Sequence, residues 1–234
     1  MEIDEENFVG WPGRPLKCEI NVLSKPEGSS MFAQGNTVVM ASLFGPHEIK
    51  HGKIQTDESV AFQTNYKTKV GPPSNEAKSQ EDLIKTACES VLFPKNFARH
   101  EVTLVVQEFQ NAGGILSCAI NAGCLAMINS GIEMQYLVVA VTACINTDGE
   151  VIVDPNEAQL KVARMALDVA FDTVSYNIIM ANGQGTCNPK EYKHLLSKCR
   201  EAARILTEYF RSIVKKYSVV LHIHLVTVIL NMNK

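Results

Sequence analysis

The 234-residue sequence lacks the features that identify several common protein classes. Only 7% of its residues are aromatic, and its formal net charge of −3 gives no general attraction to nucleic acid. Its seven cysteines form no Cys-x-x-Cys pair, which favours reduced thiols in the cytosol or nucleus over a secreted disulfide framework. No Gly-x-Gly-x-x-Gly, Walker or Gly-x-Ser-x-Gly motif is present, which removes common nucleotide-binding and hydrolase families.

The first third of the chain has the alternating pattern of β-strands. Apolar and polar residues alternate over 16–23, 29–44 and 60–67, and each run predicts a strand or hairpin. The break at Gln34-Gly35-Asn36 is typical of a hairpin turn, and Gly45-Pro46 is expected to end the second strand.

Helical and extended segments follow in turn. Apolar spacing predicts helices over 76–93, 111–131 and 188–217, and strands over 102–109, 136–145 and 151–153. Asn188, Pro189 and Glu191 form an N-cap signature for the last helix, whose charged face is interpreted as solvated in preference to RNA-binding. Residues 156–181 stay ambiguous, since helix formers are followed by strand formers.

These patterns divide the chain into an acidic N-terminal extension (1–15), one domain (16–217) and an apolar tail (218–234). The apolar stretch Val219–Leu230 has about 12 residues, too short for a membrane-spanning helix of roughly 20. Its β-branched residues favour a strand or an aggregation-prone tail.

Two segments resemble the RNase PH family. Gly28–Pro46 is similar to the opening hairpin of that family, and Gln110–Met127 is similar to its phosphate-site helix. The likeness continues through Gly149–Pro155 to Tyr217, over roughly 200 residues. It implies an α/β (α+β) fold, a single β-α-β-α two-layer sandwich of mixed sheets with packed helices, and strands across much of Val162–Met180.

Within that family the amino-acid sequence most closely resembles the RNase-PH-like subunits of the eukaryotic RNA exosome ring. The resemblance implies a non-catalytic structural subunit that supports 3′–5′ RNA processing and degradation, including rRNA maturation, turnover and surveillance. It implies pairing with other RNase-PH-like subunits, closure into a hexameric ring, docking of cap proteins and passage of RNA through the channel. No cofactor, metal or membrane is expected, and the implied location is the nucleus, nucleolus and cytoplasm.

The resemblance also implies that the phosphate site is degenerate. Gly113, Gly114, Ile115, Leu116 and Ser117 align with the family's Gly-Gly-Thr-Arg-Thr segment, so Leu116 stands where active relatives carry a phosphate-binding arginine. In the preceding helix, a second arginine is replaced by Glu89, whose carboxylate would repel phosphate. The glycine turn and the helix N-terminus remain.

The acidic motif and one further cation complete the expected site. Asp154 is present, Ala158 stands in place of the second catalytic acid, and Glu157 lies beside it. Arg99 occupies a place where relatives carry arginine, and contact with RNA or a neighbouring subunit is weighed against a solvated loop residue. Two alternatives stay open: a phosphorolytic 3′–5′ exoribonuclease, and a homodimeric metal-dependent nuclease that uses Asp154 and Glu157.

Overall fold

The computed structural model describes residues 8–48, 61–71, 74–93 and 100–221. Its helices are α1 (Asn75–Glu89), α2 (Ile115–Ser130), α3 (Glu157–Val162) and α4 (Pro189–Leu221). Its strands are β1 (Leu16–Ile20), β2 (Gly28–Gln34), β3 (Thr37–Glu48), β4 (Ala61–Lys67), β5 (His100–Gln110), β6 (Val138–Ile145), β7 (Val151–Val153), β8 (Met165–Asp172) and β9 (Ile178–Gly185).

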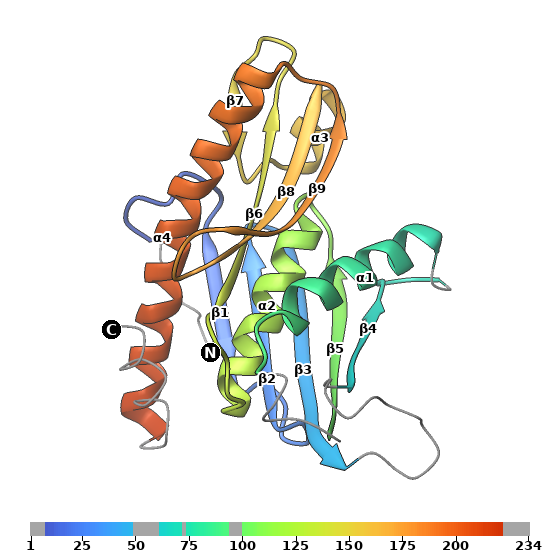
Figure 1. Ribbon diagram of the computed structural model, residues 1–234, viewed down its shortest axis with the longest axis vertical. Helices are drawn as coiled ribbons and strands as arrows, with labels where there is room; N and C mark the ends of the chain where they lie inside the picture. The colour runs from blue at the N-terminus through green and yellow to red at the C-terminus, as the bar shows by residue number, and fades with distance from the viewer. Residues whose placement is uncertain (1–7, 49–60, 72–73, 94–99, 222–234) are drawn as a thin grey trace.

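The strands form two sheets with helices packed on them. The first sheet has the order β1-β2-β3-β5-β4, with β4 parallel to β5, and the second is antiparallel with the order β7-β6-β8-β9. Helix α2 packs against both sheets with α1 beside it, and α4 packs against β6, β7 and β8 (Figure 1). The expected α/β class and the β-α-β-α order of sheet and helix are therefore confirmed.

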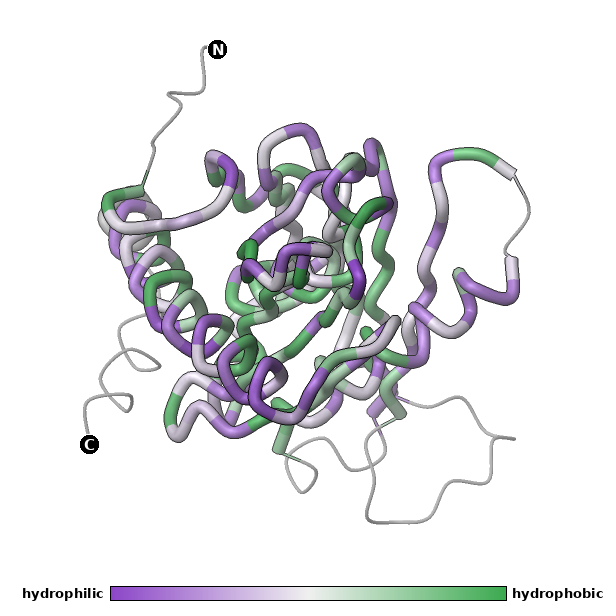
Figure 2. The backbone as a smooth tube through the Cα atoms, turned by 90° about the horizontal axis from the view of Figure 1, so that it is seen from above, coloured by the Kyte–Doolittle hydropathy of each residue, from purple (hydrophilic) through white to green (hydrophobic). Residues whose placement is uncertain are grey.

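Helix α2 is apolar all round because protein surrounds it. Its residues Ile115 to Ile128 are all buried, and hydrophobic segments fill the interior of the molecule (Figure 2). A Cβ atom on Gly123 would lie 3.2 Å from both Cys88 Sγ and Leu104 Cδ2, so a small residue is needed for this packing. The Asn121 amide donates to Ala140 O at 2.9 Å and accepts from Ala140 N at 2.8 Å. Both backbone polar groups of Ala140 in β6 therefore have a partner.

Several local predictions are confirmed. Gly35 has a φ of 56° in the turn between β2 and β3, and the side chains of β4 alternate between buried and exposed. Strands β8 and β9 lie across much of Val162–Met180, as the family resemblance implied, and the start of the ambiguous segment forms the helix α3. At the start of α4, Glu191 Oε2 accepts from Asn188 N at 2.9 Å, as a capping residue does.

Other boundaries were wrong. Gly45-Pro46 does not end β3, because the strand continues to Glu48 through a register shift and pairs His47 with Glu101. Helix α4 runs on to Leu221, so residues 219–221 are helical where a strand was expected, and residues 222–234 lie outside the described part of the chain. None of the helices in the described ranges is long and apolar enough to cross a membrane.

The N-terminal boundary of the domain was also placed too late. Phe8 makes an edge-to-face contact with Tyr209 of α4, with ring centroids 5.3 Å apart. Trp11 packs against the core and donates its indole N–H to Arg14 O at 2.9 Å. Residues 8–15 therefore belong to the folded domain.

Candidate functional site

The glycine turn before α2 is shaped by a close backbone contact. Gly113 and Gly114 have φ angles of 108° and 66°, in the left-handed region that glycine adopts easily. A Cβ atom on Gly113 would lie 2.7 Å from Pro155 O and 2.8 Å from Glu157 N. Glu157 N also donates to Ala112 O at 2.9 Å. The need for glycine here follows from the strand-to-helix segment packed against the turn.

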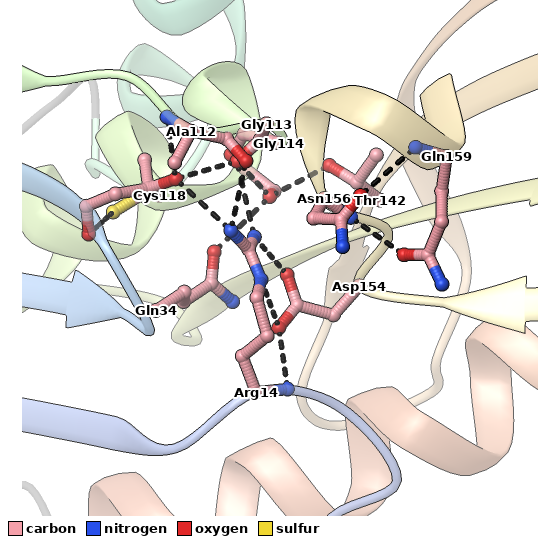
Figure 3. Close-up of polar contacts among 12 residues, drawn as sticks. Arg14, Gln34, Ala112, Gly113, Gly114, Cys118, Thr142, Asp154, Asn156 and Gln159 are labelled. Atoms are coloured by element: carbon pink, nitrogen blue, oxygen red, sulfur yellow. Dashed lines mark hydrogen bonds and ion pairs between the residues drawn. The ribbon is translucent and has the colours of Figure 1, made fainter. Parts of the chain in front are cut away.

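An arginine from the N-terminal segment reaches this turn (Figure 3). Arg14 Nη2 donates to Gly113 O at 3.0 Å and to Asp154 Oδ1 at 2.5 Å, and Nε donates to Asp154 Oδ2 at 3.1 Å. Its Nη1 donates to Ala112 O and to Thr37 Oγ1, both at 3.2 Å. A guanidinium has five N–H donors, so these five acceptors use all of them.

The Arg14–Asp154 pair is buried. The Arg14 side chain is 18% exposed and the Asp154 side chain 2% exposed. Arg14 N also donates to Asp154 Oδ2 at 2.8 Å, so both carboxylate oxygens have partners. Burial raises the pKa of Asp154, whereas the hydrogen bonds and charge of Arg14 lower it. Asp154 is thus the internal counter-ion of Arg14, held at a φ of 54° at the end of β7.

A chain of buried hydroxyls continues from the turn into the second sheet. Ser117 Oγ donates to Gly114 O at 3.0 Å, and Thr142 Oγ1 lies 2.8 Å from Ser117 Oγ and 2.6 Å from Asp168 Oδ1. Burial raises the pKa of Asp168, although hydrogen bonds from Thr142 and Asn182 lower it. Thr142 has one proton, so its hydroxyl donates either to Ser117 Oγ or to Asp168 Oδ1 at any one time.

The other residues of the expected phosphate site have no free charge. Leu116 is 4% exposed and forms part of the hydrophobic core, and Ser117 is fully buried. Ala158 is exposed on α3. Glu157 pairs with Lys161 at 2.6 Å, and this contact lowers the pKa of the Glu157 carboxyl. The cation at the turn is Arg14, whose donors face Asp154, the Thr37 hydroxyl and two backbone carbonyls.

Glu89 lies at the C-terminal end of α1, beside α2. The residues after it contact the segment beyond the C-terminus of α2: Gln135 N donates to Val91 O at 2.8 Å, and Tyr136 OH donates to Ser90 O at 2.9 Å.

The residue before Glu89, Cys88, packs against the middle of α2, since a Cβ atom on Gly123 would lie 3.2 Å from Cys88 Sγ. Gly123 is nine residues from Gly114, about 13 Å along the helix at 1.5 Å per residue. The repulsion of phosphate by the Glu89 carboxylate stays a prediction.

The predicted contact of Arg99 with RNA or a neighbouring subunit lies outside the described residues. Arg14 was missed because it was assigned to the N-terminal extension. The available signal was the pair of neighbours Gly13 and Pro15, which mark a constrained turn directly before a strand. The partnership of Thr142 with Asp168 left no sequence signal, since the two residues meet only through the pairing of β6 with β8.

The sequence also contains one His-Glu-x-x-His string, His47 to His51, which sequence reasoning overlooked. In zinc peptidases this string lies on a helix, which places both histidines on one face. Here His47 and Glu48 belong to β3, where successive side chains point to opposite faces. His51 lies outside the described residues, and the strand context does not support a zinc site of that type.

Comparisons with known proteins agree with this fold. The chain is 29% identical to the exosome complex exonuclease RRP46 homolog of Arabidopsis thaliana over 231 residues, which cover 90% of this chain and 95% of the relative. The crystal structure of rice (Oryza sativa) Rrp46 superposes with a TM-score of 0.81 at 25% identity, over 86% of this chain and 94% of the rice chain. A chain of the Archaeoglobus fulgidus exosome with RNA bound to the active site has a TM-score of 0.73 at 20% identity, over 85% and 89% of the two chains.

The family assignment rests on the segment that contains the hairpin, the glycine turn and α2. Residues 12–133, more than half of the chain, match the model of the 3′ exoribonuclease family, domain 1, of RNase PH type. This match starts two residues before Arg14, in agreement with the packing of the N-terminal segment. The chain belongs to the RNase PH, or 3′ exoribonuclease, family.

Proposed function

We propose that this protein is a non-catalytic structural subunit of the RNA exosome ring, equivalent to exosome component 5. In that role it pairs with other RNase-PH-like subunits, helps to form the RNA channel and docks cap proteins. It thereby supports 3′–5′ RNA processing and degradation, including rRNA maturation and surveillance, in the nucleus, nucleolus and cytoplasm. The similarity to Rrp46 over nearly the whole length of both chains supports this role.

The main observation that supports a non-catalytic role is that every N–H donor of the Arg14 guanidinium already has a protein acceptor. Phosphorolysis needs cations that hold inorganic phosphate beside an anionic diester, and arginine does this with its planar fork of donors. Arg14 has the right chemistry and lies at the glycine turn, but its five donors already face protein acceptors. Leu116, at the expected arginine position, contributes only apolar contacts.

A phosphorolytic exoribonuclease is the main alternative, and the word exonuclease in the name of the Arabidopsis relative favours it. Phosphate binding at the turn would require Arg14 to exchange the buried carboxylate of Asp154 for a solvated anion. Breaking a buried ion pair in this way costs about 3–5 kcal/mol. A metal-dependent nuclease built on Asp154 and Glu157 meets a similar obstacle, because both Asp154 oxygens accept from Arg14.

Two experiments test the proposal. Co-expression with the remaining ring and cap subunits should give an equimolar complex, and a monodisperse homodimer that excludes the other subunits would contradict the ring assignment. Titration of the purified chain with inorganic phosphate in a calorimeter should give no saturable heat. The Asp154→Asn variant is a useful comparison, because it removes the competing carboxylate charge while keeping nearly the same side-chain shape.

A further inference from the structure

Two arginines on α4 differ from Lys198 and Arg211 of the same helix. Lys198 pairs with Glu201 at 3.0 Å, and Arg211 pairs with Glu208 at 2.6 Å, so their charges are balanced locally. Neither Arg200 nor Arg204 forms an ion pair with any residue that the structure describes. The two lie one helical turn apart, and both contact Tyr176 in the turn between β8 and β9. Figure 1 shows this turn beside α4.

Aromatic rings hold both guanidinium groups in place. Arg204 Cζ lies 5.4 Å from the centroid of the Tyr176 ring, and Arg200 Cζ lies 5.9 Å from that of Phe171. Arg200 Nε also donates to Tyr176 O at 3.3 Å. Because stacking already restricts each arginine side chain, less conformational entropy is lost when it binds a partner. Most N–H donors of both guanidinium groups stay available for that partner.

The turn that carries Tyr176 is itself fixed by one carboxylate. Asp172 Oδ1 accepts from the backbone N–H groups of Val174 at 2.9 Å, Tyr176 at 3.0 Å and Ser175, and Oδ2 accepts from Asn177 N at 3.1 Å. The Asp172 carboxylate thus satisfies four backbone donors of a tight loop. This loop also presents Val174, which is 66% exposed and lies two residues before Tyr176, the residue that both arginines contact.

We infer that Val174, Tyr176, Arg200 and Arg204, the arginine–hairpin surface, dock an acidic segment of a partner protein chain. Carboxylates of that segment would bind the two guanidiniums, and an apolar side chain would cover Val174. Desolvated arginine and tyrosine side chains are typical of the residues that dominate interfaces. This inference adds a contact surface to the proposed role and does not depend on the state of the phosphate site.

The chemistry of the surface favours a protein partner over RNA. Single-stranded RNA is held by bases stacked on open aromatic faces, whereas here guanidiniums occupy a face of each ring. The neighbouring strand β9 is the last strand of its sheet and has no charged side chain from Ile178 to Gly185. Uncharged edge strands commonly pair with another chain.

Site-specific photo-cross-linking tests the inference. The full chain with a benzophenone amino acid at Val174 would be assembled with purified ring and cap subunits and RNA, irradiated, and digested for mass spectrometry. We expect a cross-link to a partner peptide rich in Asp and Glu. A cross-link to RNA, a cross-link to an uncharged or basic peptide, or no cross-link would overturn the inference.

Charge reversal on α4 supplies the matched control. Arg204→Glu should lower the yield of the cross-link about tenfold, because like charges then face each other. Lys198→Glu makes the same charge change on another face of α4 and should leave the yield unchanged. Arg204→Ser tests the loss of charge without reversal, and thermal unfolding checks that each variant is folded. Equal yields for Arg204→Glu and Lys198→Glu would contradict the proposed surface.

Discussion

Replacing Arg14 by alanine tests how strongly the N-terminal segment is bound to the domain. The substitution removes all five guanidinium donors and leaves the Asp154 carboxylate, which is 2% exposed, with only the Arg14 backbone N–H. Removing one partner of a buried ion pair costs about 3–5 kcal/mol. That is a large part of the 5–15 kcal/mol by which domains are typically stable.

Urea denaturation followed by circular dichroism and by tryptophan fluorescence would measure this loss. Trp11 is the single tryptophan of the chain, and its indole N–H donates to Arg14 O, so its emission reports on this segment. Arg211→Ala is the control, because an exposed pair with Glu208 contributes only about 0.3–0.5 kcal/mol. Equal stabilities of Arg14→Ala and Arg211→Ala would refute the reasoning.

The same variant should respond to pH in a defined direction. Arg14 lowers the pKa of Asp154 and burial raises it, so loss of Arg14 leaves burial as the main cause and raises the pKa further above 3.8. A carboxyl whose pKa is raised on folding favours the folded state at low pH, and this contribution is lost as pH rises through the folded pKa. The destabilisation by Arg14→Ala should therefore be smaller near pH 5 than near pH 8, and a loss of stability that is independent of pH would contradict the assigned charge state.

Three further predictions concern the turn, the hydroxyl chain and the cysteines. Gly113→Ala should destabilise the fold by more than about 2 kcal/mol because its Cβ meets Pro155 O, whereas Gly131→Ala, with open space around it, should cost about 1 kcal/mol in thermal melts. Burial raises the pKa of Asp168, so the stability of Asp168→Asn relative to wild type should improve as pH rises from 5 to 8, and a constant difference would argue against the raised pKa. Burial raises the pKa of Cys124 and Cys199 to about 12, so neither thiol should react with a disulfide reagent at pH 8 until urea unfolds the protein.

The strongly patterned elements could be predicted from the sequence, because their periodicity reflects burial. Strand β4 alternates since one face is covered, and α2 is apolar all round since two sheets enclose it. The segment 156–181 could not be assigned from propensity alone, because its helix formers continue from α3 into β8, where packing against β6 and α4 decides the structure. The family resemblance supplied what local patterns could not.

The site was predictable only in part for a related reason. The glycine turn and Leu116 lie in one motif, so the expected difference from the family's Gly-Gly-Thr-Arg-Thr segment could be read from the sequence. Arg14 and Asp154 are 140 residues apart, and only the fold brings them together. Glu89 was assigned to the same site from linear alignment, whereas in the fold it ends α1, where the preceding residue Cys88 packs against the middle of α2.

The most direct test of the central claim is an assay for phosphorolysis. The purified full chain would be incubated with single-stranded RNA, inorganic phosphate and magnesium, with an active RNase PH family enzyme as the positive control, and products would be separated by chromatography. Because the donors of Arg14 are occupied and the buried, uncharged Leu116 stands at the expected arginine position, we predict no release of nucleoside diphosphates. Phosphate-dependent release of nucleoside diphosphates by this chain would contradict the account.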